Sequence, residues 1–424
     1  MTAPPNDRFI KFANCRLAIA NQLVPCDIYF SSITGRIVDH QRFFFEQRPQ
    51  TAIVHDLGGR IVAPGFIECQ INGGYGFDFS LPTDKPNDYR DGVAKLNKEL
   101  IKTGVTSYLP TVTSQGADVY PKTLPHLAAP GTRNPADGSE SLGAHCEGPF
   151  INSEKNGIHK KEVLQLISSG VLDLESCYRA ENLQPPVVKM VTLAPELDKT
   201  ASVIQELVSR GIVVSIGHSN ASYEQMCLAV RHGATMVTHL FNATTTPHHR
   251  SPGIFGVLGA QDDLVRPCYG IIADDIHVHP SFIKVAYQAH PEGAILVSDA
   301  MCMLGLPDGK YYWTNGDYIV KKGGKLTLQD TPTIAGSSVT LLECLNNFIK
   351  WTDASIASAL RTVTETPAKM LGLYGVKGSL RPGADADFVV LSERKDVEGN
   401  VSLVVDEVWK FGVKVVGSGS IAKL

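Results

Sequence analysis

At 424 residues, the chain is long enough for one large domain with a small one beside it, since barrels of about 250 residues form single domains. Hydrophobic residues make up 43% and charged residues 19%, a balance that is typical of a folded globular protein and excludes a disordered chain. The formal net charge of −4 argues against a nucleic-acid or anionic-membrane partner, so a phosphorylated ligand would need a local cluster of cations.

The sequence carries no targeting signal that we recognise. Residues 1–7 are polar and proline-rich, without the charged-then-apolar pattern of a secretory signal. No stretch reaches the roughly 18 apolar residues of a membrane-spanning helix. The nine cysteines are an odd number without C-x-x-C spacing, which is typical of reduced thiols. We therefore expect a cytoplasmic protein.

The N-terminal part of the chain, residues 9 to 62, reads as a series of short strands. The β-like runs are Phe9–Phe12, Leu17–Ala20, Asp27–Phe30 and Arg36–Val38.

The middle of the chain repeats one theme, a short apolar run followed by an amphipathic stretch. Near-continuous apolar runs of this length are typical of strands that are buried on both faces. The eight runs are Gly65–Ile71, Thr106–Val112, Leu142–Cys146, Val187–Leu193, Ile212–Ile216, Thr235–Thr238, Tyr269–Ala273 and Ala294–Val297.

Helix-like segments lie between these runs. Ser202–Arg210, Tyr223–His232 and Ser281–His290 each place their apolar residues on one stripe, and Gly211 and Gly233 follow the first two as predicted C-terminal caps. The alternation of strands and helices predicts an α/β fold, a parallel (β/α)8 TIM-type barrel, although an open doubly wound sheet has the same periodicity.

Further short β-like runs lie near the C-terminus, and we expect them to pair with those near the N-terminus in a small β-sandwich. The predicted division is a composite β-sandwich domain of residues 1–62 and 378–424, and a barrel domain of residues 63–377. The C-terminal runs are Gly378–Leu380, Asp387–Leu391, Ser402–Trp409 and Val413–Val416.

Four polar residues follow the predicted barrel strands: Glu147, His218, His239 and Asp299. Taken singly, each is more often a turn or surface residue than a ligand. The C-terminal ends of barrel strands meet at one face, so the four together favour a catalytic site. Two histidines and a glutamate suit a zinc-like ion that activates water, and Asp299 could then take and return a proton.

Other polar residues are open to two interpretations. The run that ends in Arg250 lies in a Pro- and Thr-rich loop, where a solvated loop is more common than a phosphate site. His277 fits a site group or a loop residue equally well, and His159 is only a weak candidate by position. Gly336–Ser338 favours helix N-capping over anion binding.

Two motifs resemble the amidohydrolase superfamily, Pro64–Glu68 on the first strand and Lys377–Leu380 through Gly383–Leu391 near the C-terminus, with Glu68 where Asp is usual. The internal motifs resemble the narrower N-acetylglucosamine-6-phosphate deacetylase family, and the likeness runs along nearly the whole chain. These motifs are Gln70–Gly74, His145–Phe150, Gly217–Ser219, Thr238–Ala243, Gly270–Asp274 and Ala335–Ser338.

The resemblance implies hydrolytic deacetylation of N-acetylglucosamine 6-phosphate. It implies a metal held by Glu147, His218 and His239, with Asp299 as the acid/base and His159 as a group that polarises the acetyl carbonyl. It further implies a homodimer in which the neighbouring subunit supplies an arginine. The expected substrate-binding residues are Gln70, Asn72, Asn242, Ala243, Arg250 and His277.

The first-strand motif bears on the number of metal ions. Many amidohydrolases carry His-x-His there for a second metal, whereas this sequence has Gln70-Ile71-Asn72. An amide is a poor ligand beside imidazole, so we predict one divalent ion per subunit, with zinc favoured. The alternatives are an amidohydrolase of cyclic amides, which would need the missing His-x-His, and a catalytically silent scaffold, which would lack a ligand or Asp299.

Overall fold

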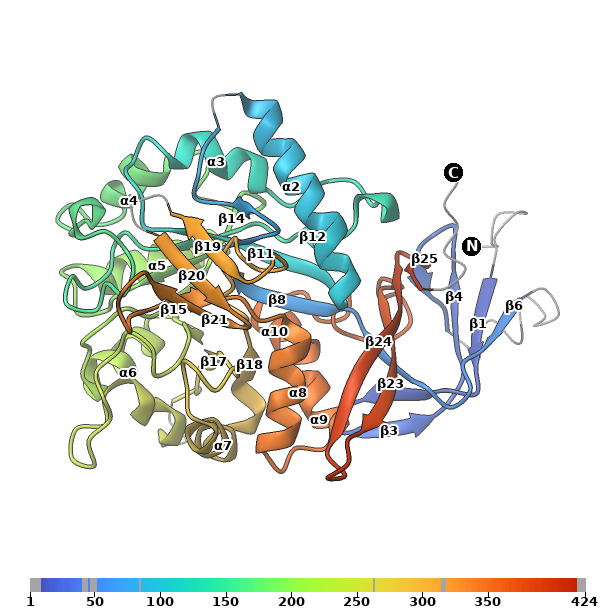
Figure 1. The fold of residues 1–424 in the computed structure, drawn as a ribbon. Coiled ribbons are helices and arrows are strands. Elements are labelled where there is room, and N and C mark those ends of the chain that lie inside the picture. Colours follow the sequence, from blue (N-terminus) through green and yellow to red (C-terminus); the bar gives the residue numbers. More distant parts are fainter. Residues whose placement is uncertain are drawn as a thin grey trace.

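The computed structural model describes residues 9–39, 45, 52–83, 85–261, 264–313 and 318–417. Residues 1–7, which the prediction about a targeting signal concerns, lie outside these ranges. A helix-covered barrel forms most of the molecule, and a sheet region beside it carries both ends of the chain (Figure 1).

All eight predicted apolar runs form parallel barrel strands, and consecutive strands pair with each other. The Asp299 amide donates to the Gln70 carbonyl over 2.9 Å, and the Asn72 amide donates to the Ala300 carbonyl over 2.8 Å. These bonds join the last strand to the first, which excludes the open-sheet alternative. The strands are β8 (Phe66–Ile71), β11 (Val105–Thr113), β13 (Ala144–Glu147), β14 (Val188–Leu193), β15 (Val213–Ile216), β16 (Met236–Val237), β17 (Cys268–Ile271) and β18 (Ala294–Leu296).

The helices cover the outside of the barrel (Figure 1). Gly211 and Gly233 follow α5 (Thr200–Ser209) and α6 (Tyr223–Arg231) with φ of 78° and 112°, which confirms their predicted capping role. Within the described ranges, no helix is long and apolar enough to span a membrane. The helices are α2 (Pro86–Leu100), α3 (Tyr120–Leu127), α4 (Val171–Tyr178), α5 (Thr200–Ser209), α6 (Tyr223–Arg231), α7 (Pro280–Ala289), α8 (Leu341–Trp351), α9 (Ile356–Arg361) and α10 (Glu365–Met370).

The loops of the barrel also contain short strands and 3-10 helices. The strand β12 (Glu140–Ser141) pairs with β11, and β9 (Gly73–Gly74) pairs with β10 (Phe77–Asp78). The 3-10 helices are η2 (Ile101–Thr103), η3 (Pro135–Asp137), η4 (Lys161–Val163), η5 (Gly253–Gly259) and η6 (Pro291–Gly293).

The two ends of the chain do share a sheet. Its order is β25 (Val413–Val416), β24 (Val401–Lys410), β23 (Phe388–Lys395), β7 (Ile61–Pro64), β2 (Arg16–Ile19) and β3 (Gln22–Pro25). A second sheet has the order β5 (Arg36–Ile37), β4 (Ile28–Ser31), β1 (Phe9–Ala13) and β6 (Ile53–Asp56). Buried aromatic rings, with Phe12 edge-on to Phe388 and Trp409, fill the core of this region. The division at residues 62 and 378 stays a prediction.

One predicted strand is wrong. Gly378–Leu380 forms a bend, in which Gly378 has a φ of +64°. A Cβ at this glycine would lie 2.4 Å from the Thr364 carbonyl oxygen, so the backbone is held close to the loop before α10. The short β-like run in this segment therefore belongs to a turn that packs on the barrel.

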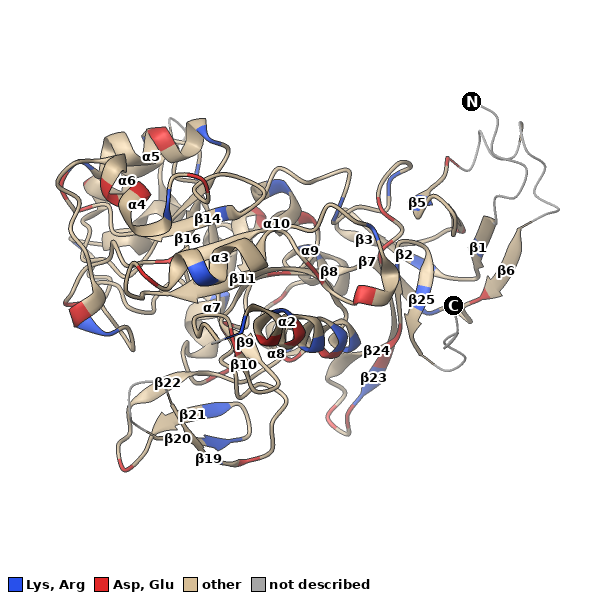
Figure 2. Cartoon of the chain, turned by 90° about the horizontal axis from the view of Figure 1, so that it is seen from above, with Lys and Arg blue, Asp and Glu red and all other residues tan. Residues whose placement is uncertain are grey.

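A four-stranded antiparallel sheet between β18 and α8 was not predicted. Its strands are β19 (Gly309–Tyr312), β20 (Tyr318–Lys322), β21 (Lys325–Leu328) and β22 (Ile334–Ser337). It projects from the barrel with lysines along β20 and β21 (Figure 2). The predicted N-capping role of Gly336–Ser338 is wrong, because β22 extends through Ser337 and the Thr340 hydroxyl caps α8 by accepting the Glu343 amide.

Candidate metal centre and substrate cavity

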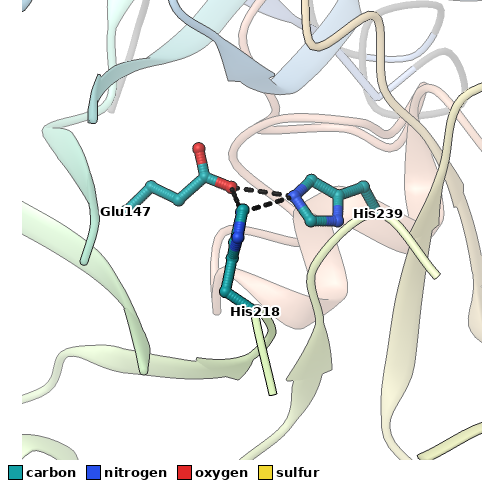
Figure 3. Close-up of side chains that lie close together, drawn as sticks. All are labelled: Glu147, His218 and His239. Atoms are coloured by element: carbon teal, nitrogen blue, oxygen red, sulfur yellow. Dashed lines mark hydrogen bonds and ion pairs between the residues drawn. The ribbon is translucent and has the colours of Figure 1, made fainter. Parts of the chain in front are cut away.

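The barrel brings three potential metal ligands to one point. Glu147 is the last residue of β13, and His218 and His239 each lie two residues beyond the ends of β15 and β16. The two imidazole Nε2 atoms are 3.1 Å apart and lie 3.2 and 3.0 Å from Glu147 Oε1. Figure 3 shows the three side chains pointing toward one another from separate segments. All three are at most 4% exposed, so this is an enclosed cluster of donor atoms.

The hydrogen bonds around the cluster suit a cation. The Lys155 carbonyl can only accept, so His218 donates to it from Nδ1 over 2.7 Å and keeps the Nε2 lone pair free. The Gln70 amide donates to Glu147 Oε1 over 3.0 Å and holds the carboxylate in place. His239 Nδ1 is buried without a hydrogen-bond partner in the structure. Two imidazoles and one oriented carboxylate are the donor set of a catalytic zinc site.

The electrostatics of the cluster favour positive charge. Burial alone would raise the pKa of Glu147, but the neighbouring His218 and His239 hold that pKa well below its usual range. Burial likewise lowers the pKa of His239, yet the carboxylates of Glu147 and Asp299 outweigh it and raise that pKa to about 9. The buried carboxylates therefore stabilise positive charge in this cluster more strongly than burial disfavours it. A site that binds a cation needs this balance.

A second acidic cluster, formed by Glu140, Asp385 and Asp387, has metal-like spacing. Lys377 contacts all three carboxylates, and Lys410 lies 2.6 Å from Glu140 and 2.8 Å from Asp387. Because ammonium groups already neutralise these carboxylates, this cluster does not suit a metal ion.

Asp299 lies beside the candidate metal ligands, three residues beyond the end of β18. The Asn72 amide donates to its Oδ1 over 2.8 Å, which leaves Oδ2 available. Burial, and then the negative charge of Glu147, raise the pKa of Asp299 to about 6. A carboxyl group whose pKa lies near neutrality can both accept and return a proton.

A cavity of about 230 Å³ opens beside these residues. Its lining includes Glu147, His218, His239, Asp299, Asn72 and His159. Burial is the main cause that lowers the pKa of His159 to about 3, so its ring is neutral. His159 Nε2 is 4.0 Å from Glu147 Oε2, which places this nitrogen next to the candidate metal site.

Asn242, Ala243 and His277 line the same cavity. The Asn242 Nδ2 is buried without a partner in the structure, so it is a donor available to a ligand. His277 Nδ1 lies 2.7 Å from Asp274 Oδ2, and Asp274 also accepts the His277 backbone amide, which leaves Nε2 as the free ring nitrogen. Sequence reasoning gave Asp274 no role, although a carboxylate three residues before a histidine is a recognisable orienting pair.

Two predicted substrate-binding residues do not line this cavity. The Gln70 side chain contacts Glu147, and the exposed Arg250 lies in the loop that follows β16. Other supporting contacts were invisible in the sequence, because the Lys155 carbonyl is a backbone group and Ser114 reaches the site from the end of β11.

Comparison with known proteins identifies the family to which the chain belongs. The model of the amidohydrolase family matches residues 61–415, and the chain belongs to this family. Within it, the chain is 42% identical to the N-acetylglucosamine-6-phosphate deacetylase of Rattus norvegicus over 393 residues, which cover 92% of this chain and 93% of the rat protein. The deacetylase of the same name from Bacillus subtilis is 32% identical, over 85% of this chain and 89% of its own.

Solved structures agree with this placement. A mutant N-acetyl-D-glucosamine-6-phosphate deacetylase from Mycobacterium smegmatis, in complex with N-acetyl-D-glucosamine 6-phosphate, superposes with a TM-score of 0.77 and 27% identity. The match covers 97% of this chain and 99% of that chain.

Proposed function

We propose that this protein hydrolyses N-acetyl-D-glucosamine 6-phosphate to D-glucosamine 6-phosphate and acetate. The observation that carries the proposal is the cluster of Glu147, His218 and His239 beside Asp299 in one cavity. Relatives that bear the deacetylase name over most of the chain support the choice of substrate.

The residues Glu147, His218 and His239 would hold a divalent cation, for which zinc suits the donor set best. Such an ion, when bound, supplies Lewis acidity that polarises a carbonyl and acidifies water. Because Gln70 and Asn72 replace the usual pair of first-strand histidines, metal analysis of the purified protein should give one tightly bound ion per chain. Two tightly bound ions would contradict this assignment.

The chain's own groups account for the proton transfers. His159 donates from Nε2 to the acetyl carbonyl oxygen, which stabilises the charge that develops there. Asp299 takes a proton from the attacking water as the new C–O bond forms. It then donates that proton to the sugar nitrogen as the C–N bond breaks, so the amine and acetate leave. Asn72 holds Oδ1 of Asp299 and so fixes the direction of Oδ2.

The opposite side of the cavity would hold the phosphorylated sugar. Asn242 and Ala243 would contact the sugar, and His277, with Nδ1 on Asp274, would donate from Nε2 to the phosphate. Arg250 would reach the phosphate from the neighbouring subunit of a homodimer. The Arg250→Ala and Asp299→Asn variants should each be inactive alone, and mixing them should restore activity at up to about a quarter of the sites. If the arginine acted within its own subunit, mixing would restore no activity.

Replacing Asp299 with Asn tests the proposed chemistry. The amide keeps the shape and the contact to Asn72 but cannot take a proton, so acetate release should fall by about 10²-fold to 10⁴-fold. The metal content should stay unchanged, because Asp299 is outside the ligand set. A variant that retains substantial turnover would show that another group serves as the base.

A further inference from the structure

We propose that Ser114 is a positioning residue that fixes the proton of His159 on Nε2 and holds the ring toward the substrate carbonyl. This inference rests on the proposed function, because it concerns the group that would polarise the scissile amide. Ser114 directly follows β11, the second barrel strand, and is 4% exposed. His159 lies in the loop after the third barrel strand and is 6% exposed.

Both polar groups of Ser114 meet one nitrogen of the histidine. The Ser114 backbone amide donates to His159 Nδ1 over 3.2 Å, and the Ser114 Oγ lies 2.6 Å from the same nitrogen. A backbone N–H can only donate, so Nδ1 must present its lone pair. The single proton of the neutral ring is therefore on Nε2, the nitrogen on the side of Glu147.

The opposite tautomer has a geometric cost. Ser114 Oγ also lies 3.3 Å from the Glu147 carbonyl oxygen, so a chain from His159 Nδ1–H through the hydroxyl to that carbonyl is conceivable. In that arrangement the Nδ1 proton would point at the Ser114 amide proton, and Nε2 would carry no hydrogen. A ring in that state could not donate to a carbonyl oxygen, so the backbone amide selects the productive tautomer and the hydroxyl fixes the ring.

Among the residues that the structure describes, no other group holds the His159 ring through a hydrogen bond. Its Nε2 has no bond shorter than the 4.0 Å approach to Glu147, and its ring packs on His218 with centroids 4.6 Å apart. Loss of the hydroxyl would thus leave the ring with one weak bond, and small displacements of a donor reduce the stabilisation of developing charge.

The variant Ser114→Ala tests the inference, with Ser139→Ala as the matched control. Ser139 is likewise buried, and its hydroxyl donates to the Val105 carbonyl over 2.6 Å at the opposite end of the same strand. In the zinc-loaded protein, we expect kcat of Ser114→Ala to fall by about tenfold or more with KM within about twofold, and Ser139→Ala to match the wild type. With an N-trifluoroacetyl substrate, whose carbonyl needs less polarisation, the fall in kcat of Ser114→Ala should be smaller.

Nitrogen-15 NMR of histidine-labelled, zinc-loaded protein reads the tautomer directly, with His159 assigned by comparison with His159→Gln. We expect the wild-type ring to carry its proton on Nε2, and Ser114→Ala to give a broadened or mixed signal. A proton on Nδ1 in the wild type, or equal turnover of the two serine variants, would overturn the inference. If the wild type released no acetate, the proposed function would fail while the NMR signal still decided the tautomer.

Discussion

Three of the four residues at the candidate metal centre and its acid/base have an unusual backbone. His218, His239 and Asp299 adopt φ values of 48°, 26° and 47°, in the left-handed region that residues with a Cβ rarely occupy. Each such residue costs about 1–3 kcal/mol and persists only where the surroundings fix it. The strain turns the chain sharply at the ends of β15, β16 and β18, so that the side chains face the cavity.

The amide of Gln70 offers a test of how the ligand set is held. Gln70→Leu keeps the approximate size but removes the hydrogen bond to Glu147, so metal affinity should fall by about 10-fold to 100-fold in competition with a chelator. Gln165→Leu is a matched control, because the Gln165 amide contacts the Cys177 thiol instead. Equal metal affinities of the two variants would show that Gln70 does not support the site.

The sequence was most informative for residues that act through their own side chains. Glu147, His218, His239 and Asp299 could be singled out because each follows an apolar run of recognisable length. The supporting contacts could not, since Ser114 is 45 positions from His159 and Gln70 is 77 positions from Glu147. Only the closed barrel brings such pairs together.

At the scale of elements, regular burial made the barrel predictable. Strands buried on both faces read as continuous apolar runs, and each was found where it was expected. The sheet β19–β22 was missed because its strands alternate with charged residues such as Lys310, Lys321 and Lys325, which read as a solvated loop. It packs around a small core of its own that includes Met301 and Trp313.

This sheet reaches the cavity through β22, where Gly336 and Ile334 are part of the lining. Gly336 has a φ of +99°, and a Cβ there would lie 2.5 Å from the Cγ of Met301, another lining residue. Gly336→Ala should therefore lower the free energy of unfolding by about 1–3 kcal/mol and raise KM by displacing Met301. Gly323→Ala is the control for backbone strain without a clash, because Gly323 has a φ of +57° and open space around it. An unchanged KM for Gly336→Ala would contradict a role of β22 in shaping the cavity.

At the scale of the whole molecule, a buried ion network joins the barrel to the sheet of the chain ends. Lys410 on β24 is fully buried and donates to the Thr106 carbonyl of β11, to Glu140 of β12 and to Asp387. Burial alone would raise the pKa of Asp387, but Lys377 and Lys410 hold that pKa well below its usual range. The network thus links segments that are distant in the sequence, which is why sequence reasoning could predict the pairing only in outline.

Removing one cation tests that linkage. Lys410→Met leaves Glu140 and Asp387 with less compensation in a buried setting, so the free energy of unfolding should fall by about 3–5 kcal/mol in chemical denaturation. Lys102→Met, which removes an exposed partner of Glu99, should change stability by at most about 1 kcal/mol. Similar stabilities for the two variants would show that the buried network is not what couples the two regions.

The most direct test of the proposed activity is acetate release by the zinc-loaded protein from N-acetyl-D-glucosamine 6-phosphate, measured beside unphosphorylated N-acetyl-D-glucosamine. We expect rapid release from the phosphorylated sugar and little from the other, because the proposed phosphate contacts would hold the acetamide against His159 and Asp299. Release from neither sugar would contradict the proposed activity, and equal release from both would contradict the proposed phosphate site.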